Sequence, residues 1–386
     1  MVFVTIVLDG VGAGWQPDAA VYGDEGADTL GHVLARCKPS LPNLQASGLG
    51  NIRDLTGCPP ASSPRASWGR MQEQSAGKDS TTGHWELAGL KLDAPFPTYP
   101  DGFPKDVVEA FCRKAGVPGI LGNRPESGTV IIDEFGLAHM ATGHPIVYTS
   151  ADSVFQIATH VDVVPLDELY RVCEVARQQI CVGQHAVGRV IARPFTGQPG
   201  SFSRLSDKRR DFSRLPERPP LQQLLQQAGV QTISVGKVAD LFGGVGFDRT
   251  AKTHGNAHGM EVTLQEMHEA DGPTFVWTNL IEFDQEYGHR NNPEGFSASL
   301  EEFDQMLPRF LEALPAGSAL LITADHGNDP TYPGTDHTRE YVPLLYYDGH
   351  AARSLGTRHS FADHAATVAE FFGLDTRFGA SSFIAT

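Results

Sequence analysis

The sequence predicts an α/β protein whose main domain has a mostly parallel sheet with helices on both faces. Short apolar runs rich in β-branched residues recur along the chain, and small or acidic residues follow each run. Helical patterns lie between the runs, and strands that alternate with helices are typical of a parallel sheet. The runs lack clean polar alternation, which is expected when both faces of a sheet are covered.

The strands of the main domain are expected where these apolar runs occur. The first run, VFVTIVL, has no basic segment before it and ends too soon for a membrane span. We therefore expect a buried strand there and not a signal peptide. The predicted strands are Val2–Leu8, Gln231–Val235, Thr274–Ile281, Ala319–Thr323 and Val342–Tyr347.

Helices are expected between the later strands. Apolar residues recur at helical spacing in Leu221–Ala228, Ser297–Leu314 and Ala362–Phe372. Such periodicity is typical of helices that bury one face. A short helix is also expected within Gly77–Leu90, after three hydroxyl-bearing residues.

The middle third of the chain predicts a second, smaller α/β domain inserted into the first. Its strand candidates are Thr129–Ile132, Ile146–Thr149 and Val190–Ala192. Two linker-like stretches flank this region, Asp93–Phe103 and the Pro-, Gly-, Ser- and Arg-rich Arg193–Pro220. We therefore expect a discontinuous main domain, residues 1–94 and 215–386, with residues 95–214 as the insertion.

Composition bounds the partners and the location. Lys and Arg total 30 and Asp and Glu total 46, which leaves a formal net charge of −16. Such a chain repels nucleic acid and anionic membranes, so we expect neither as a partner. Its cysteines are scattered without a CxxC pair, which is typical of a reducing compartment. We expect a soluble, cytoplasmic protein that is a monomer or a weak homo-oligomer.

Acidic residues and histidines follow several predicted strands. Asp9 comes directly after the first strand, and Asp284 and Asp325 come after two others. Ligands bind outside the carboxyl ends of strands in open α/β sheets, so these side chains are expected to meet. Carboxylates gathered in one place are costly unless cations neutralise them. The expected metal ligands are Asp9, Asp284, His289, Asp325, His326 and His337.

This ligand set predicts two ions. A mixed Asp and His set suits Mn²⁺ or Zn²⁺ better than Ca²⁺, and the lack of Cys argues against structural zinc. The set is too large for one catalytic ion with an open position, whereas two ions about 4 Å apart would use it in phosphoryl transfer. The alternative for any one of these aspartates is a turn or a helix cap. Their repetition across distant segments favours the metal site.

The segment GKDSTTGHWELAGL offers hydroxyl groups for such a reaction. Ser80, Thr81 and Thr82 stand just ahead of a short helix, where backbone N–H groups can hold a phosphate. A nearby metal would lower the pKa of the hydroxyl and activate it. The alternative is that these residues, with Asp79, only cap the helix.

The inserted region carries candidate substrate ligands. Arg189 lies in VGRVIARPF, Arg204 in SFSRLSDKRRD and Asp152 in YTSADSV. Arginine forks suit phosphate oxygens, and an aspartate can accept hydrogen bonds from sugar hydroxyls. The alternative is a solvated loop, which we prefer for Lys208–Arg210.

The motifs LDGVGAG, GKDSTTGHWE, NLIEFDQEYGHR, ITADHGNDP and GTDHTREYVPLL have the order and spacing of the alkaline-phosphatase superfamily. Within it, the chain resembles the phosphopentomutase family essentially end to end, and VYTSADSVFQIA and VVPLDELYRVC also fit. The resemblance implies an alkaline-phosphatase-like core with an inserted cap. It also implies interconversion of ribose 1-phosphate and ribose 5-phosphate, and of the 2-deoxyribose pair.

The resemblance further implies roles for single residues. One Mn²⁺ ion would be held by Asp284, His289 and His337, and the other by Asp9, Asp325 and His326. The cap residues Asp152, Arg189 and Arg204 would meet the ribose and the distal phosphate.

One departure from the family pattern concerns the nucleophile. The family has a phosphorylated threonine where this chain has Ser80, and serine keeps the hydroxyl; Thr81 and Thr82 remain as alternatives. The resemblance implies that a sugar bisphosphate such as glucose 1,6-bisphosphate primes this residue. The alternative functions are a metal-dependent phosphomonoesterase, a cofactor-independent phosphoglycerate mutase, and a binding protein that keeps the ligands without the chemistry.

Overall fold

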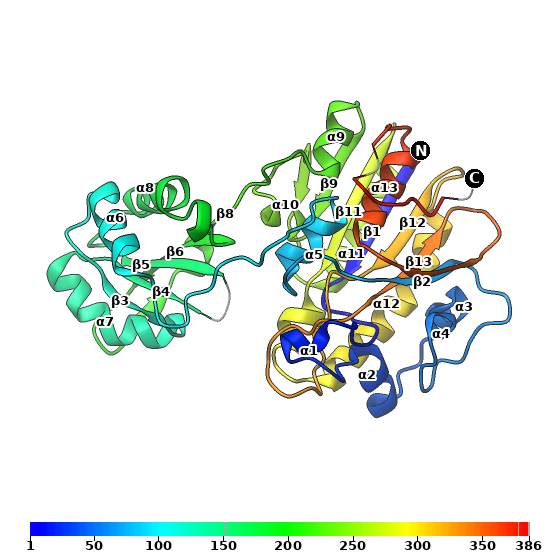
Figure 1. Cartoon of the computed structure of the whole chain (residues 1–386), viewed down its shortest axis with the longest axis horizontal. Coiled ribbons are helices and arrows are strands. Elements are labelled where there is room, and N and C mark those ends of the chain that lie inside the picture. Colours follow the sequence, from blue (N-terminus) through cyan, green and yellow to red (C-terminus); the bar gives the residue numbers. More distant parts are fainter. Residues whose placement is uncertain (151–152, 377, 385–386) are drawn as a thin grey trace. The chain divides into compact units, whose positions relative to one another are not determined.

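The computed structural model describes residues 1–150, 153–376 and 378–384. The chain divides into two compact units (Figure 1). The first, which we call the core unit, consists of Met1–Ala94 and Pro216–Thr386, and the second, the inserted unit, is Pro95–Leu215. Asp152, a predicted substrate ligand, lies outside the described residues.

The core unit is built on a sheet with the strand order β10-β9-β11-β1-β12-β13-β2-β14. β1 (Val2–Leu8) has β11 (Thr274–Leu280) parallel on one side and β12 (Ala319–Thr323) parallel on the other. These three strands are buried along their whole length, as expected for a sheet covered on both faces. β13 (Val342–Tyr347) runs antiparallel to both its neighbours, so the sheet is mostly but not wholly parallel.

The strands predicted for the core unit are confirmed, and the third of them ends at Leu280. Three strands near the ends of this sheet, Ser67–Met71, Arg249–Ala251 and Ser354–Arg358, were not predicted, because each run is short and contains an arginine, a glycine or both in place of a continuous apolar stretch. The remaining strands of this sheet are β2 (Ser67–Met71), β9 (Gln231–Val235), β10 (Arg249–Ala251) and β14 (Ser354–Arg358).

Helices cover both faces of the core sheet (Figure 1). Trp277 of β11 stacks on His84 of α5 (Ser80–Leu87) and lies beside His364 of α13 (Ala362–Phe371). The next residue, Thr278, hydrogen-bonds instead to Thr263 of α11 (Asn256–Glu269). Successive residues of a strand point to opposite faces, so α5 and α13 lie on one face and α11 on the other.

The predicted helices of the core unit are confirmed with small shifts of their ends. α12 (Pro293–Ala313) starts before the expected Ser297, because the side chain of Asn292 caps it by accepting the N–H of Gly295. No helix in the described part of the chain is long and apolar enough to cross a membrane. The other helices of this unit are α1 (Ala19–Tyr22), α2 (Thr29–Cys37), α3 (Pro42–Ser47), α4 (Leu49–Ile52), α9 (Leu221–Gln227), α10 (Val238–Leu241) and the π-helix η4 (Phe283–Gly288).

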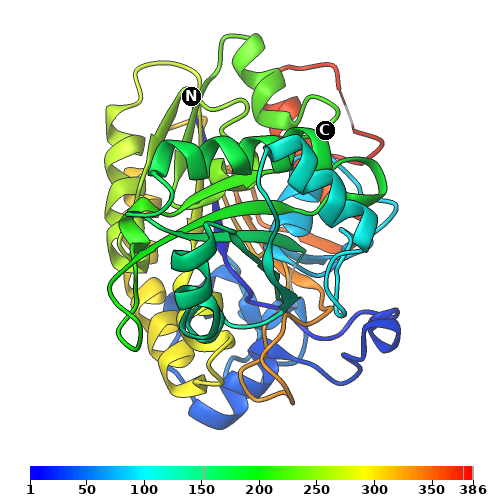
Figure 2. The same cartoon turned by 90° about the vertical axis from the view of Figure 1, so that its left-hand side faces the viewer.

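The inserted unit has its own sheet, with the order β3-β4-β5-β6-β7 and β8 paired to β6. Val147 packs into a cluster with residues of α6 and α8, whereas its neighbour Tyr148 packs with residues of α7. This sheet is therefore also covered on both faces, and Figure 2 shows its helices alongside the strands. The bounds are β3 (Leu121–Pro125), β4 (Ile146–Thr149), β5 (Val154–His160), β6 (Arg189–Thr196), β7 (Ser203–Arg204), β8 (Arg210–Ser213), α6 (Lys105–Ala115), α7 (Gly128–Thr142) and α8 (Leu166–Val175), with the short helices η1 (Ala176–Ile180), η2 (Gly183–His185) and η3 (Ser206–Lys208).

Two predictions for this region are wrong. Thr129–Ile132 was expected to be a strand but forms the first turns of α7, capped by the Ser127 side chain, which accepts the N–H of Val130. An apolar run this short does not separate a strand from a helix by periodicity. Arg193–Pro220 was expected to be a linker but contains the end of β6 and all of β7 and β8. β7 and β8 form because each pairs with β6, and local composition does not reveal this pairing.

Candidate active site

Acidic residues meet at one edge of the core sheet. Asp9 follows β1, Asp284 lies in η4 just after β11, and Asp325 follows β12. Because β1 is parallel to both neighbours, the carboxyl ends of the three strands share that edge. All three side chains are buried. The structure thus brings together side chains that are far apart in the sequence.

The predicted ligands form two overlapping groups. Ligand atoms of Asp9, Asp325 and His326 lie within 4.8 Å of one another, as do those of Asp284, His326 and His337. His326 Nε2 lies 3.2 Å from Asp9 Oδ1 and 3.4 Å from Asp325 Oδ2. His289 is not in either group, but it lies beside the second, with its Nε2 3.3 Å from Asp284 Oδ2.

Neighbouring groups orient these carboxylates. Asn279 donates to Asp9 Oδ2 at 2.8 Å, and Asn328 donates to Asp284 Oδ1 at 2.7 Å. The N–H of Gly10 donates to Asp325 Oδ1 at 3.1 Å. Asp325 Oδ2, in contrast, is buried and receives no amide donor; the nearest polar groups are the ring nitrogens of His84 and His326, at 3.1 and 3.4 Å. Buried carboxylates gathered this closely are costly unless positive charge is near, so this donor set fits a divalent cation.

The electrostatics of the site follow from burying several carboxylates together. Burial raises the pKa of Asp9, and the charges of Asp325 and Asp284 raise it further. Burial lowers the pKa of His326, but the nearby Asp325 and Asp9 outweigh it and hold the pKa well above its ordinary value. Burial also lowers the pKa of His289, yet the hydrogen bond with Asp284 brings it to about 9. Without ions, protonated histidines therefore balance the carboxylates.

This balance predicts how the stability of the metal-free chain depends on pH. The folded pKa of His289 is about 9, above the ordinary 6.5. Its contribution to stability is therefore complete below pH 6.5 and is lost as the pH rises through about 9. We expect the unfolding temperature of chelator-treated protein to fall across this window. Mn²⁺-loaded protein, in which ions replace the protons, should not show the fall. Thermal unfolding followed by circular dichroism tests this, and a rise for the metal-free chain would contradict it.

Ser80 is the first residue of α5 and contacts the first ligand group. Its Oγ lies 3.1 Å from His326 Nε2 and 3.5 Å from Asp9 Oδ1. Thr82 Oγ1 instead donates to Asp79 Oδ2 at 2.6 Å. Asp79 Oδ1 also accepts the N–H groups of Thr81 and Thr82. These two amides, which we expected to be available to a phosphate, are therefore already engaged in capping the helix.

α5 approaches the metal-ligand segment closely because Gly83 has no side chain. A Cβ at Gly83 would lie 2.0 Å from the carbonyl oxygen of Asp325 and 3.0 Å from its Cβ. Backbone atoms cannot yield as a flexible side chain does, so we expect Gly83→Ala to separate α5 from this segment. Overpacking of this kind costs about 1–3 kcal/mol. The urea concentration at the midpoint of unfolding and the activity per folded molecule should both fall.

Gly259→Ala is the matched control for that variant. Gly259 is also buried in a helix, but its added Cβ would meet only the ends of side chains, Leu280 Cδ2 at 3.0 Å and Thr253 Cγ2 at 3.8 Å. We expect a small change in stability and no change in activity. Equal losses for both variants would show that the close approach of Gly83 has no special role.

Two further residues connect the loops of the site, and sequence analysis missed both. Arg339, which is 2% exposed, donates to Glu73 and to the carbonyl of Gly77, in the segment that leads to Ser80. Glu340 accepts the N–H groups of Gly14 and Thr29. Burial raises the pKa of Glu340 to about 7. Both residues follow His337 closely in the segment TDHTRE. Only the folded structure shows what they contact.

The inserted unit holds the predicted arginines. Arg189, at the start of β6, lies 3.4 Å from Asp211. Arg204, in β7, is exposed, and its Nη1 and the Tyr148 hydroxyl both lie next to Gly128. Burial raises the pKa of Tyr148, and Arg193 and Arg204 oppose that rise. The Tyr148 hydroxyl is buried without a hydrogen bond to any described residue. Tyr148 and the nearby Arg193 are therefore further candidate substrate ligands in this unit.

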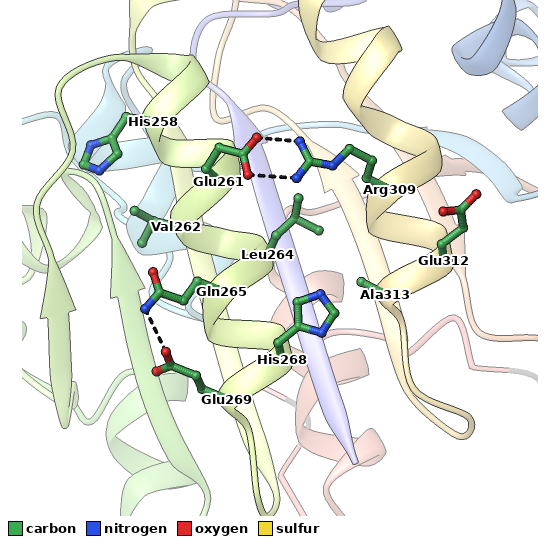
Figure 3. A pocket seen from close by; sticks show the side chains of 10 residues that line it. All are labelled: His258, Glu261, Val262, Leu264, Gln265, His268, Glu269, Arg309, Glu312 and Ala313. Carbon is green, nitrogen blue, oxygen red and sulfur yellow. Dashed lines mark hydrogen bonds and ion pairs between the residues drawn. The ribbon is translucent and has the colours of Figure 1, made fainter.

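A surface groove between α11 and α12 is unrelated to the predicted ligands. Figure 3 shows Glu261 paired with Arg309 across it and Gln265 hydrogen-bonded to Glu269 on α11. None of the residues that line it belongs to either ligand group. Its one arginine is paired with Glu261, and it holds no catalytic candidate.

Comparisons with known proteins give a consistent result. Residues 1–376 match the family model described as the metalloenzyme superfamily. A phosphopentomutase of Caldanaerobacter subterraneus subsp. tengcongensis is 51% identical, covering 99% of this chain and 96% of its own length. A phosphopentomutase of Anaeromyxobacter dehalogenans is 50% identical, covering 99% and 97%. Among solved structures, the PH0037 protein from Pyrococcus horikoshii has a TM-score of 0.50 at 17% identity and covers 98% of each chain, which is a likeness of fold.

Proposed function

Because this chain belongs to the phosphopentomutase family within the metalloenzyme superfamily, we propose that it interconverts ribose 1-phosphate and ribose 5-phosphate, and the 2-deoxyribose pair. Membership of the family makes it an isomerase that transfers a phosphoryl group within its substrate. The metalloenzyme match and the two ligand groups support binding of divalent metal. The identities of the substrate, the nucleophile, the metal and the primer are part of the proposal.

The observation that carries the proposal is the position of Ser80. Its hydroxyl contacts His326 and Asp9 of the first ligand group and is itself buried. A hydroxyl held against a cation site is suited to nucleophilic attack on phosphorus. In the proposed cycle, Ser80 carries a phosphoryl group and donates it to the free hydroxyl of a bound pentose phosphate. The resulting bisphosphate then returns its other phosphate to Ser80.

Two Mn²⁺ ions complete this site in the proposal. Bound there, they supply positive charge that offsets the charge on the transferring phosphoryl group. The buried carboxylates of Asp9 and Asp325, whose ligand atoms lie together with that of His326, support a cation at the first group. The ligands of one ion are Asp9, Asp325 and His326, and those of the other are Asp284, His289 and His337.

The inserted unit acts as the substrate-selecting cap in this proposal. Arg189, Arg204 and Asp152 bind the distal phosphate and the sugar, and the exposure of Arg204 supports this role. A sugar bisphosphate such as glucose 1,6-bisphosphate primes Ser80 by phosphorylating it. The enzyme is cytoplasmic in this proposal, which is supported by its five cysteines, all of them free thiols.

The decisive experiment follows phosphorus signals by NMR. Mn²⁺-loaded protein is incubated with ribose 1-phosphate and a trace of glucose 1,6-bisphosphate. We expect conversion to ribose 5-phosphate without release of inorganic phosphate. A control without the bisphosphate should react slowly or not at all, because Ser80 is then not primed.

A metal-dependent phosphomonoesterase is the alternative with the same ligand groups and Ser80. It would release inorganic phosphate, because water would accept the phosphoryl group from Ser80. Phosphate release that matches the loss of ribose 1-phosphate would replace the mutase assignment with this one. The metal ligands and the nucleophile would keep their roles.

A further inference from the structure

His84 is a buried side chain to which the sequence assigned no role. It lies in α5, one turn after Ser80, and is 0% exposed. Its Nδ1 is 2.9 Å from the carbonyl oxygen of Ser80 and 3.1 Å from Asp325 Oδ2. One ring nitrogen therefore touches both the residue proposed as nucleophile and a residue proposed as metal ligand.

The neighbours of the ring define which nitrogen carries a hydrogen. Nδ1 faces a carbonyl oxygen and a carboxylate oxygen, which only accept hydrogen bonds, so Nδ1 must be a donor. Nε2 is buried without a hydrogen bond to any described residue. The ring also stacks on Trp277, with 5.8 Å between ring centroids and 22° between ring planes. Packing thus fixes the ring so that its Nδ1–H lies between Ser80 and Asp325.

We propose that His84 is a positioning residue for the ion site formed by Asp9, Asp325 and His326. Its Nδ1–H holds the Asp325 carboxylate in the orientation that places Oδ2 toward a cation and ties this carboxylate to the first turn of α5. Groups that orient metal ligands in this way typically contribute tenfold to a hundredfold in metal affinity. The inference rests on the metal role assigned above to Asp325.

The chain offers a matched control in His364. This histidine is also 0% exposed, and its ring lies 5.5 Å from the same Trp277. Its Nε2 is 2.8 Å from Thr5 Oγ1 and its Nδ1 is 2.7 Å from the carbonyl of Leu87. These contacts belong to the fold rather than to the ligand groups, so its loss disturbs the same layer without touching Asp325.

The experiment measures Mn²⁺ binding to the full-length, chelator-treated protein through the electron paramagnetic resonance signal of free Mn²⁺. Asp284→Asn removes a carboxylate from the second group, so the strongly bound ion that remains is the one at Asp9, Asp325 and His326. In this background, we expect His84→Leu to weaken binding of that ion about tenfold to a hundredfold. His84→Asn, nearly identical in shape to leucine but with a donor near the position of Nδ1, should retain most of the affinity.

Two controls separate positioning from general damage. His364→Leu in the Asp284→Asn background should leave Mn²⁺ affinity unchanged. In an Asp9→Asn background, where the remaining ion sits in the second group, His84→Leu should have little effect. In the otherwise unaltered enzyme, His84→Leu should raise the Mn²⁺ concentration needed for half-maximal activity, and His84→Asn should not.

Several outcomes would overturn the inference. Equal weakening by His84→Leu and His364→Leu would assign the effect to core packing, and equal weakening by His84→Leu and His84→Asn would exclude the Nδ1 donor. If Asp284→Asn and Asp9→Asn each keep two strongly bound ions, the ligand assignment itself fails, and the inference falls with it. If those parent variants each lose one ion but His84→Leu changes nothing, only the role of His84 fails.

Discussion

Ser80→Ala should abolish phosphoryl transfer while the fold and the metal affinity stay intact. The hydroxyl is the only group removed, and its contacts are with His326 and Asp9 rather than with the core. Loss of a covalent nucleophile commonly costs on the order of 10⁴-fold or more in turnover. Turnover of ribose 1-phosphate, with circular dichroism and Mn²⁺ binding on the same samples, measures both halves of this expectation.

Two variants test whether Ser80 itself is the nucleophile. Ser80→Thr keeps a hydroxyl and adds a methyl, so it should retain activity well above that of Ser80→Ala. Thr81→Val removes a neighbouring hydroxyl in the same helix turn and should leave transfer largely intact. Mass spectrometry of bisphosphate-treated protein should find the phosphate on Ser80. Substantial turnover by Ser80→Ala, with loss of turnover in Thr81→Val, would move the nucleophile to Thr81.

Asp9→Asn should stabilise the metal-free chain and at the same time remove its activity. Burial raises the pKa of Asp9, and Asp325 and Asp284 raise it further, so its ionised form costs stability at neutral pH when no ion is bound. The amide has nearly the same shape and no charge, and each kcal/mol relieved raises the unfolding temperature by roughly 2–4 °C. The same change removes a proposed ligand and a contact of Ser80, so one Mn²⁺ ion and the turnover should both be lost.

Asp304→Asn provides the comparison case, because burial raises the pKa of Asp304 too, but hydrogen bonds from Leu44 and Asn43 oppose that rise. Asp304 is 1% exposed and accepts hydrogen bonds from the N–H groups of Leu44 and Asn43. An amide nitrogen there would face those donors, so this variant should lose stability yet keep its activity per folded molecule. Thermal unfolding of chelator-treated samples compares the two. If Asp9→Asn also lowers the unfolding temperature, repulsion in the carboxylate group is not what limits the stability of the metal-free chain.

The local sequence predicted much of the core unit and the composition of the site. Continuous apolar runs such as Val2–Leu8 are buried strands because a sheet covered on both faces needs apolar side chains in both directions. An acidic residue after such a strand, as with Asp9 and Asp325, is predicted to lie at the carboxyl edge because parallel strands end there together. These inferences need only periodicity and chain order. They fail where the signal is short, as in Thr129–Ile132, which lies in α7.

What the sequence determined by itself was the five most apolar strands of the core sheet and the kinds of side chain that follow them, and hence a predicted chemistry of carboxylates, histidines and a hydroxyl. Only the tertiary structure decided how these groups are held. Asn279 orients Asp9, Arg339 holds the segment before Ser80, and His84 lies between Ser80 and Asp325. Apart from the contact of His84 with Ser80 inside α5, these contacts join residues that are far apart in the sequence. Local propensity carries no information about such contacts, because they exist only once the helices and strands have packed together.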